Sequence, residues 1–179
     1  LYACGQNANK EISGSTNAKE LIPVQLMDNT NSPLQNIKEV ISSGGVYQIA
    51  LALDRDNNLW AWGHGYYGYG NANTTINQNA QIVARNVESV ANFGNYYSSS
   101  CTQVTIIKKI NGGLEYFGLP TFGAAVNSKV STPLSLPQDI VDFGILGHKN
   151  ANSNTFACIS GDSIYLSYLC ATTPTKLLI

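Results

Sequence analysis

The sequence predicts an all-β fold built from repeated four-stranded antiparallel sheets, on three observations. A short phrase that begins with an apolar residue and ends with glycine returns as Leu-Tyr-Ala-Cys-Gly at 1–5, Leu-Trp-Ala-Trp-Gly at 59–63 and Leu-Glu-Tyr-Phe-Gly at 114–118. Strand-length apolar runs alternate with turns rich in Gly and Asn. No convincing helical stripe of apolar residues extends over several turns. Such repeats indicate the stacked blades of a propeller-like array.

The spacing of the phrase sets the length of one repeat. A less regular fourth copy begins at Ile164, so the four starts lie 58, 55 and 50 residues apart. We therefore expect a single repeat domain over 1–179 with about three to four blades. Its approximate repeats are 1–58, 59–113, 114–163 and a partial repeat at 164–179. Because one blade cannot cover both of its faces, aromatic side chains of the phrase are expected to pack between neighbouring blades.

The clearest repeat, from Ile37 to about Ile82, predicts four short strands. They are expected at 37–41, at the apolar run 47–53, at the phrase 59–63 and at 80–83. The third strand contains Trp60 and Trp62, and we expect one of them in the core and the other between blades or at the surface.

The same elements recur in the other repeats. First-strand patterns occur at 87–90 and 140–143, and second-strand patterns at 103–107 and 154–159. The closing elements contain proline, and Pro23 and Pro133 lie 110 residues apart, which is two periods of 55. Since proline cannot donate to a sheet ladder, we expect it at a sheet edge or at the first residue of a strand.

Composition narrows the classes of function. The formal net charge is −1 and only 12% of residues are charged, which argues against a nucleic-acid surface or a polybasic membrane patch. No apolar run reaches the roughly 20 residues that a membrane span needs. Polar surface must come largely from Asn, Ser, Thr, Gln and Tyr, and Asn suits turns because it tolerates the left-handed backbone region.

The four cysteines, Cys4, Cys101, Cys158 and Cys170, form no C-x-x-C pair and have no His at ligand spacing, which argues against zinc. Cys4 takes the place of Trp62 in its copy of the phrase, so we expect it to be a small core residue. Cys158 belongs to an apolar strand and is expected to be a free buried thiol. A disulfide between Cys101 and Cys158 is the alternative.

The Gly-rich loop 63–70 holds the candidate binding residues His64, Tyr66, Tyr67 and Tyr69. Tyrosine offers a large contact area at low conformational cost, so we expect these four residues to form a partner-binding patch. Packing between blades is the alternative for one or two of the tyrosines. His64 has no carboxylate or nucleophile nearby in sequence, which argues against catalysis.

Asp54 and Asp56 are candidate calcium ligands, but their turn lacks the number and spacing of carboxylates that a calcium loop uses. We favour a structural role in which an Asp side chain bonds the backbone of its own turn. The sequence shows no Ser-His-Asp arrangement, no paired carboxylates and no metal-ligand cluster. We therefore expect no catalytic residue, no metal and no cofactor.

Where glycine closes each phrase, the sequence resembles the regulator of chromosome condensation repeat family. That family follows an apolar-Tyr-x-Trp-Gly strand with a loop rich in Gly and Asn, a Pro-x-x-Val element, a Val-x-x-Val-x-x-Gly strand and a His-Thr-x-Ala-Leu strand. The segment 5–13 follows the loop in outline, 63–70 keeps its glycines and 118–123 keeps its frame, whereas the His is absent from every copy. The resemblance covers nearly the whole chain and implies part of a seven-bladed propeller, or an open arc.

The resemblance implies a non-catalytic, protein-binding module whose partner is a small GTPase of the Ran or Rab type, with guanine-nucleotide exchange as its activity. Exchange would work by differential binding, in which the module stabilises the nucleotide-free GTPase more than the loaded form. The family uses His and acidic residues of propeller loops together with a wedge-like insertion, so the missing His positions favour binding over exchange. The Asn-rich, weakly charged composition would suit a bacterial effector translocated into a host cell.

Two other hypotheses belong to different classes. Some propellers of this family are secreted and inhibit an enzyme by plugging its active site, and oxidised cysteines would favour that role. The third hypothesis is a structural scaffold that carries other domains of a longer chain. An incomplete array also leaves blade edges and an apolar face exposed, so self-association through blade edges is expected.

Overall fold

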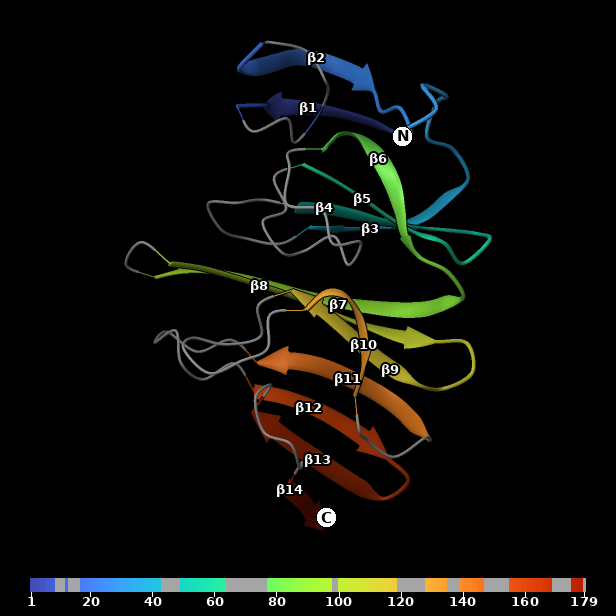
Figure 1. The fold of residues 1–179 in the computed structure, drawn as a ribbon, viewed down its shortest axis with the longest axis vertical. Coiled ribbons are helices and arrows are strands. Elements are labelled where there is room, and N and C mark those ends of the chain that lie inside the picture. Colours follow the sequence, from blue (N-terminus) through green and yellow to red (C-terminus); the bar gives the residue numbers. More distant parts are fainter. Residues whose placement is uncertain are drawn as a thin grey trace.

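The structure is a computed structural model in which every described element is a β-strand (Figure 1). It describes residues 1–8, 12, 17–42, 49–63, 77–97, 100–118, 128–134, 139–146, 155–168 and 175–178. The strands are β1 (Tyr2–Gln6), β2 (Lys19–Gln25), β3 (Ile37–Ser42), β4 (Ile49–Asp54), β5 (Leu59–Gly63), β6 (Asn77–Ala84), β7 (Val87–Tyr97), β8 (Ser100–Lys109), β9 (Leu114–Gly118), β10 (Ser128–Pro133), β11 (Ile140–Leu146), β12 (Thr155–Ser160), β13 (Ser163–Tyr168) and β14 (Thr175–Leu178).

The strands form four sheets, and within each sheet the strands that follow one another in the chain pair antiparallel. Sheet 1 contains β1 and β2, sheet 2 contains β3 to β6, sheet 3 contains β7 to β10 and sheet 4 contains β11 to β14. The sheets succeed one another along the long axis of the molecule, with the N-terminus near one end and the C-terminus at the other (Figure 1). The predicted all-β, propeller-like array of four-stranded antiparallel blades is confirmed.

The repeated phrase forms the third strand of each four-stranded sheet. It is β5 in sheet 2 and β9 in sheet 3, and its least regular copy lies in β13 of sheet 4. In sheet 1 the phrase is β1, so the two strands of this sheet correspond to the third and fourth strands of the others. Each sequence repeat therefore begins halfway through one sheet and ends halfway through the next.

The glycine that closes the phrase has a left-handed backbone in all three copies. Gly5, Gly63 and Gly118 have φ angles of 125°, 93° and 112°, which residues with a Cβ rarely adopt. Space is not the constraint, because a Cβ built on Gly5 would lie 3.8 Å from Ile12 Cδ1, an ordinary contact. The recurring glycine therefore marks a bend that the backbone must make as it leaves the third strand.

Gly5→Ala is expected to lower the free energy of unfolding by about 1–2 kcal/mol, because alanine is strained at this φ. Gly144 in β11 is the matched control, since its φ lies outside the left-handed region and a Cβ there would meet no described atom within 4 Å. Gly144→Ala is expected to leave stability unchanged or to raise it slightly. Urea unfolding of both variants measures the difference, and equal midpoints would contradict the role of the phrase glycine.

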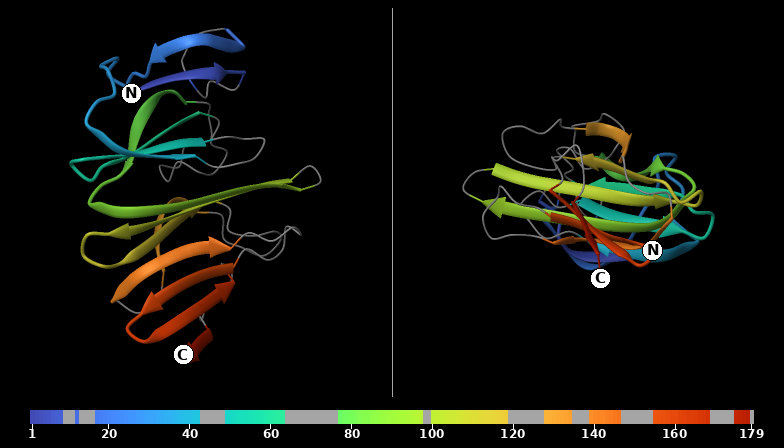
Figure 2. Two further views of the ribbon diagram at one scale, coloured as in Figure 1. Left: turned by 180° about the vertical axis from the view of Figure 1, so that it is seen from behind. Right: turned by 90° about the horizontal axis from the view of Figure 1, so that it is seen from below.

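The first strands share one irregularity in the three four-stranded sheets. The pairing register shifts after Ile37 in β3, after Val87 in β7 and after Ile140 in β11. Such bulges bend a strand and increase its twist. β3 lies against β7, and β7 lies against β11, as expected for blades whose first strands surround a propeller axis. Figure 2 shows the sheets from two further sides.

Buried apolar side chains fill the space between neighbouring sheets, which divides the core into three layers. The layer between sheets 1 and 2 contains Leu26, Leu34, Ala52, Trp62 and Ala80. The layer between sheets 2 and 3 contains Ile49, Leu51, Leu53, Leu59, Ala61, Val87, Ile107 and Phe117. The layer between sheets 3 and 4 contains Val104, Ile106, Leu114, Ile140 and Cys158. Aromatic residues of the phrase therefore pack between blades, as predicted.

The expectation that Trp60 and Trp62 have different surroundings is wrong. Residues two apart on a strand point to the same face, and both tryptophans pack into the layer between sheets 1 and 2. The alternate residues of the same strand, Leu59 and Ala61, pack in the layer between sheets 2 and 3. One copy of the phrase thus supplies side chains to two layers.

The cysteines follow the prediction only in part. Cys158 is a free thiol in the core, and burial raises its pKa to about 11, so the prediction for this residue is confirmed and the alternative disulfide to Cys101 is not formed. Cys4 is exposed, and its prediction as a core residue is wrong. It takes the phrase position of Trp62 and Phe117, but no described sheet precedes sheet 1 to cover it.

Both repeat prolines lie at sheet edges, as predicted. Pro23 belongs to β2 and Pro133 to β10, and each of these strands is the outermost one of its sheet. A proline in such a strand breaks no ladder on the side that faces no other strand.

Candidate functional site

The connections between strands leave the sheets on two opposite sides, because consecutive strands are antiparallel. The turns β4–β5, β8–β9 and β12–β13 and the link between sheets 2 and 3 share one side, which we name the turn side. Strands β3 and β5 end at the opposite side, which we name the loop side. The predicted binding residues His64, Tyr66, Tyr67 and Tyr69 belong to the β5–β6 connection and lie outside the described residues.

A buried carboxylate organises the turn between β4 and β5. Asp54 is only 4% exposed. It accepts hydrogen bonds from the backbone N–H groups of Asp56 (2.9 Å) and Asn58 (2.8 Å), from Asn58 Nδ2 (3.0 Å) and from Trp60 Nε1 (2.8 Å). Desolvation raises the pKa of this carboxyl, but the hydrogen bonds together lower it by more, so the pKa lies below its ordinary value. Asp56 accepts a hydrogen bond from Asn36 Nδ2 at 3.1 Å. The structural role predicted for this turn is therefore confirmed.

The turn between β8 and β9 repeats the backbone bonds of the turn between β4 and β5. The N–H of Asp54 donates to the Asn58 carbonyl at 3.0 Å, and the N–H of Lys109 donates to the Gly113 carbonyl at 2.8 Å. The left-handed position is asparagine in one turn and glycine in the other. The four non-glycine residues with positive φ are Asn31, Asn36, Asn57 and Asn86, among the described residues. Asn thus has the turn role that composition predicted.

Hydrogen bonds from both neighbouring turns fix the link between sheets 2 and 3. The N–H of Val87 donates to the carbonyl of Asn57 in the turn of sheet 2 at 2.9 Å. The N–H of Ile110 in the turn of sheet 3 donates to the carbonyl of Asn86 in the link at 2.9 Å. The turn side is therefore a bonded frame that sets the position of one blade relative to the next.

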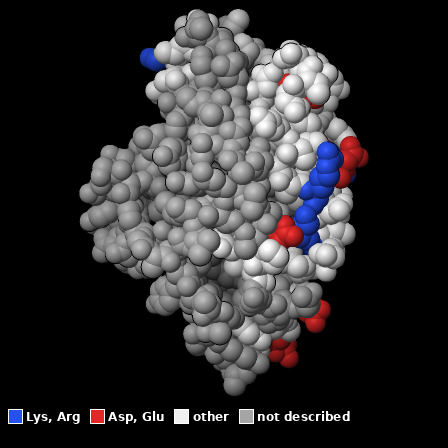
Figure 3. All heavy atoms as spheres, in the orientation of Figure 1, with Lys and Arg blue, Asp and Glu red and all other residues white. Residues whose placement is uncertain are grey.

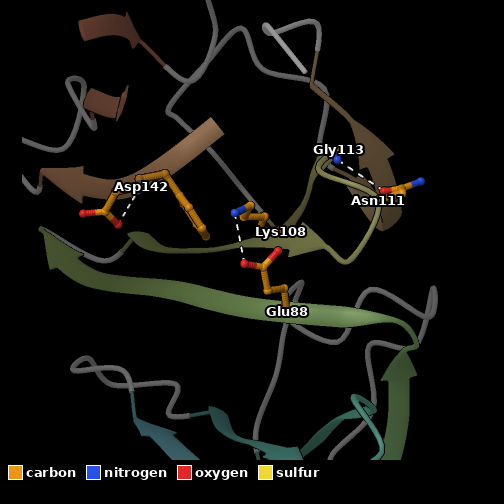
Figure 4. A network of polar contacts seen from close by, with 6 residues as sticks. Glu88, Lys108, Asn111, Gly113 and Asp142 are labelled. Carbon is orange, nitrogen blue, oxygen red and sulfur yellow. Dashed lines mark hydrogen bonds and ion pairs between the residues drawn. The ribbon is translucent and has the colours of Figure 1, made fainter. Parts of the chain in front are cut away.

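Charged side chains add to this frame. Arg85 donates to Asn58 Oδ1 at 3.0 Å, and Lys109 Nζ donates to the carbonyl of Arg85. Lys108 Nζ lies 3.0 Å from Glu88 Oε1, and the two side chains point toward one another from β8 and β7 (Figure 4). In the space-filling view, basic side chains form a stripe flanked by acidic ones on the turn side (Figure 3). Exposed pairs of this kind contribute little to stability.

A hollow of about 370 Å³ lies where the two-stranded sheet 1 meets the first strand of sheet 2. Its lining residues are Leu1, Gln35, Asn36, Ile37, Lys38, Glu39 and Val40. Val40 is 54% exposed although it pairs with Ala52, a fully buried residue of the same sheet face. The hollow combines apolar surface with the charges of Lys38 and Glu39.

In the described residues, no group of three or more His, Cys, Asp or Glu side chains is placed to hold a metal ion. The same part of the chain contains no helix that is long and apolar enough to cross a membrane. Sequence reasoning missed the bond between Asp54 and Trp60, although an Asp that precedes a tryptophan across a polar turn was the available signal.

The sheets and the turn-side frame define a propeller-like module of stacked four-stranded blades. The same fold occurs in the crystal structure of human WBSCR16, which matches with a TM-score of 0.61 at 16% sequence identity. The match covers 99% of this chain and 48% of that chain, so this chain spans about half the length of its structural neighbour. No protein-family model and no curated protein matches the sequence.

Proposed function

We propose that this chain is a non-catalytic propeller module of the regulator of chromosome condensation type and that it binds a small GTPase through its loop side. The observation that carries the proposal is the anchoring of the β5–β6 connection. Trp62, the last side chain before this connection, is 3% exposed in the core layer, and Gly63 bends the chain away with φ of 93°. Rigid strands therefore hold the start of the segment that contains the candidate tyrosines.

The proposal is also supported by a difference between the turn side and the loop side of the array. On the turn side, the side chains of Asp54, Asn58 and Arg85 bond within the chain and position the blades. A partner that bound there would compete with this internal frame. Loops on the opposite side can vary without disturbing it, which is how propellers carry binding sites. The fold shared with WBSCR16, an RCC1-like protein, supports the repeat type.

Binding to a panel of Ran-type and Rab-type GTPases, each nucleotide-free and loaded, tests the proposal. The variant Tyr66→Ala/Tyr67→Ala/Tyr69→Ala is expected to weaken binding at least tenfold, because removing aromatic contacts at a hot spot costs about 2 kcal/mol or more. Ile110→Ala is the matched control, since Ile110 is 54% exposed on the turn side. Absence of binding by the wild-type protein across the panel would reject the GTPase as partner.

Nucleotide release separates exchange from simple binding. An exchange factor accelerates release because it binds the nucleotide-free GTPase more tightly than the loaded form. His64→Ala is expected to leave the release rate close to that of the wild type, because His64 does not occupy the family's His position. Oxidised cysteines would favour the secreted-inhibitor hypothesis, but Cys4 and Cys158 are free thiols.

A further inference from the structure

The turn between β8 and β9 contains the one Asn-Gly pair of the sequence, Asn111-Gly112. Asn111 is exposed on the turn side. The N–H of Gly113 donates to Asn111 Oδ1 at 3.2 Å, so the side-chain carbonyl is held over the backbone of its own turn (Figure 4). This bond keeps the side-chain amide beside the peptide nitrogen of Gly112.

An asparagine in this position can react with the peptide bond that follows it. The Gly112 nitrogen loses its proton to hydroxide and attacks Asn111 Cγ, a new C–N bond forms, and the side-chain nitrogen leaves as ammonia. Water then opens the resulting imide ring. Opening at one carbonyl gives aspartate, and opening at the other gives isoaspartate, in which the main chain runs through the Asn111 Cβ and Cγ atoms. One water is consumed and one ammonia is released, with no oxidant or reductant.

The residue that follows an asparagine decides how readily this ring can form. Glycine has no Cβ to crowd the attacking nitrogen. Asn36 and Asn86 also lie in turns, but they precede the β-branched residues Ile37 and Val87. Asn111 is therefore the asparagine whose neighbour hinders the reaction least.

One backbone hydrogen bond restrains the attacking nitrogen. The N–H of Gly112 donates to the Lys109 carbonyl at 2.8 Å, and this bond must open before the nitrogen can lose its proton. Ile110 is 54% exposed and Asn111 is exposed, so the turn can open locally while the sheets stay packed. The N–H of Gly113 can then stabilise the negative charge that develops on Asn111 Oδ1 during the attack.

An isoaspartate in this turn would alter the bonds between sheets 2 and 3. It adds one carbon to the main chain inside the turn that the bond from the Lys109 N–H to the Gly113 carbonyl closes at 2.8 Å. The neighbouring Ile110 N–H donates to the Asn86 carbonyl at 2.9 Å and ties the turn to the link between the sheets. A longer main chain displaces the atoms that make both bonds.

We propose that Asn111 is a site of spontaneous deamidation, at which isoaspartate forms and loosens the turn-side frame between sheets 2 and 3. The modification needs only water. Its product belongs to the substrate class of carboxyl methyltransferases that recognise isoaspartyl residues. The site lies on the turn side, so its outcome is independent of the proposed GTPase binding by the loop side.

Ageing of the folded protein at mildly alkaline pH tests the chemistry. Peptide mapping by mass spectrometry is expected to show conversion of Asn111 before any other asparagine. An isoaspartyl methyltransferase is expected to transfer methyl groups from S-adenosylmethionine to this position. Asn111→Gln is the matched control and is expected to remain unmethylated there, because glutamine must close a larger ring. No conversion at Asn111, or equally fast conversion at Asn57, would overturn the proposal.

Urea unfolding of the aged protein tests the structural consequence. The isoaspartyl fraction, separated by chromatography, is expected to unfold at a lower midpoint than the unaged protein. Freshly prepared Asn111→Asp adds the carboxylate without the extra carbon, and Asp56 holds the corresponding position in the β4–β5 turn, so this variant is expected to keep the wild-type midpoint. Equal midpoints for the isoaspartyl fraction and Asn111→Asp would overturn the loosening of the frame.

Discussion

Asp54→Ala is expected to lower the free energy of unfolding by about 3 kcal/mol, because the donors of Asp56, Asn58 and Trp60 lose their shared acceptor inside the turn. The carboxylate is 4% exposed, so water can replace it only in part. Urea unfolding measures the loss as a lower midpoint with an unchanged slope.

Asp56→Ala is the control for this variant, since Asp56 makes one exposed hydrogen bond to Asn36. This substitution is expected to lower the free energy of unfolding by less than about 1 kcal/mol.

The contribution of Asp54 to stability also depends on pH. The folded-state pKa lies below the ordinary value of 3.8, so the stabilisation is complete above that pH and is lost as the pH falls below it. The difference between Asp54→Ala and the wild type should therefore shrink below about pH 3.8, and a constant difference would contradict the assigned carboxylate role.

Phe117→Ala is expected to lower the free energy of unfolding by about 3–5 kcal/mol, because it leaves a cavity in the layer between two blades. Phe117 is fully buried between sheets 2 and 3 with Leu51, Leu53 and Val87. Truncation would leave a cavity in a layer that neither sheet can close alone, because the turn-side hydrogen bonds fix the spacing of the sheets. Thermal and urea unfolding measure the loss.

Phe117→Leu is the graded control and is expected to retain most of the stability, since it removes less volume. Ile110→Ala, at a half-exposed turn residue, controls for the loss of apolar surface without a cavity. A Phe117→Ala protein with wild-type stability would mean that the sheets of the array do not depend on each other.

Much of the fold could be predicted because two of its constraints leave a recurring pattern in the sequence. The glycine of the phrase recurs since its backbone is left-handed at Gly5, Gly63 and Gly118, and the apolar residues recur since both faces of a blade are buried. The alignment of repeats with sheets could not be predicted in this way. A periodic sequence looks the same wherever the first unit is taken to begin, and only strand pairing shows that the phrase is a third strand.

The error at Cys4 and the missed contact between Val87 and Asn57 both arise because they depend on how neighbouring sheets meet. Cys4 has the phrase position of Trp62, but burial depends on a neighbouring sheet that the sequence pattern does not count. Sequence spacing also failed to show that Val87 and Asn57 are bonded across two sheets, because that contact depends on how the blades meet. The candidate tyrosines could be named from composition alone, and their partner-binding role stays a prediction.

The half-sheet offset between sequence repeats and sheets has a consequence for how such a gene can change. Removing residues 59–113 would delete β5 to β8 and join β4 directly to β9. Leu59 and Leu114 both follow turns with the same backbone bonds. Strands β4 and β9 would therefore pair through the same kind of hairpin turn, and β3, β4, β9 and β10 would form a four-stranded sheet. Unequal recombination by one period can therefore add or remove a blade without a breakpoint at any sheet boundary.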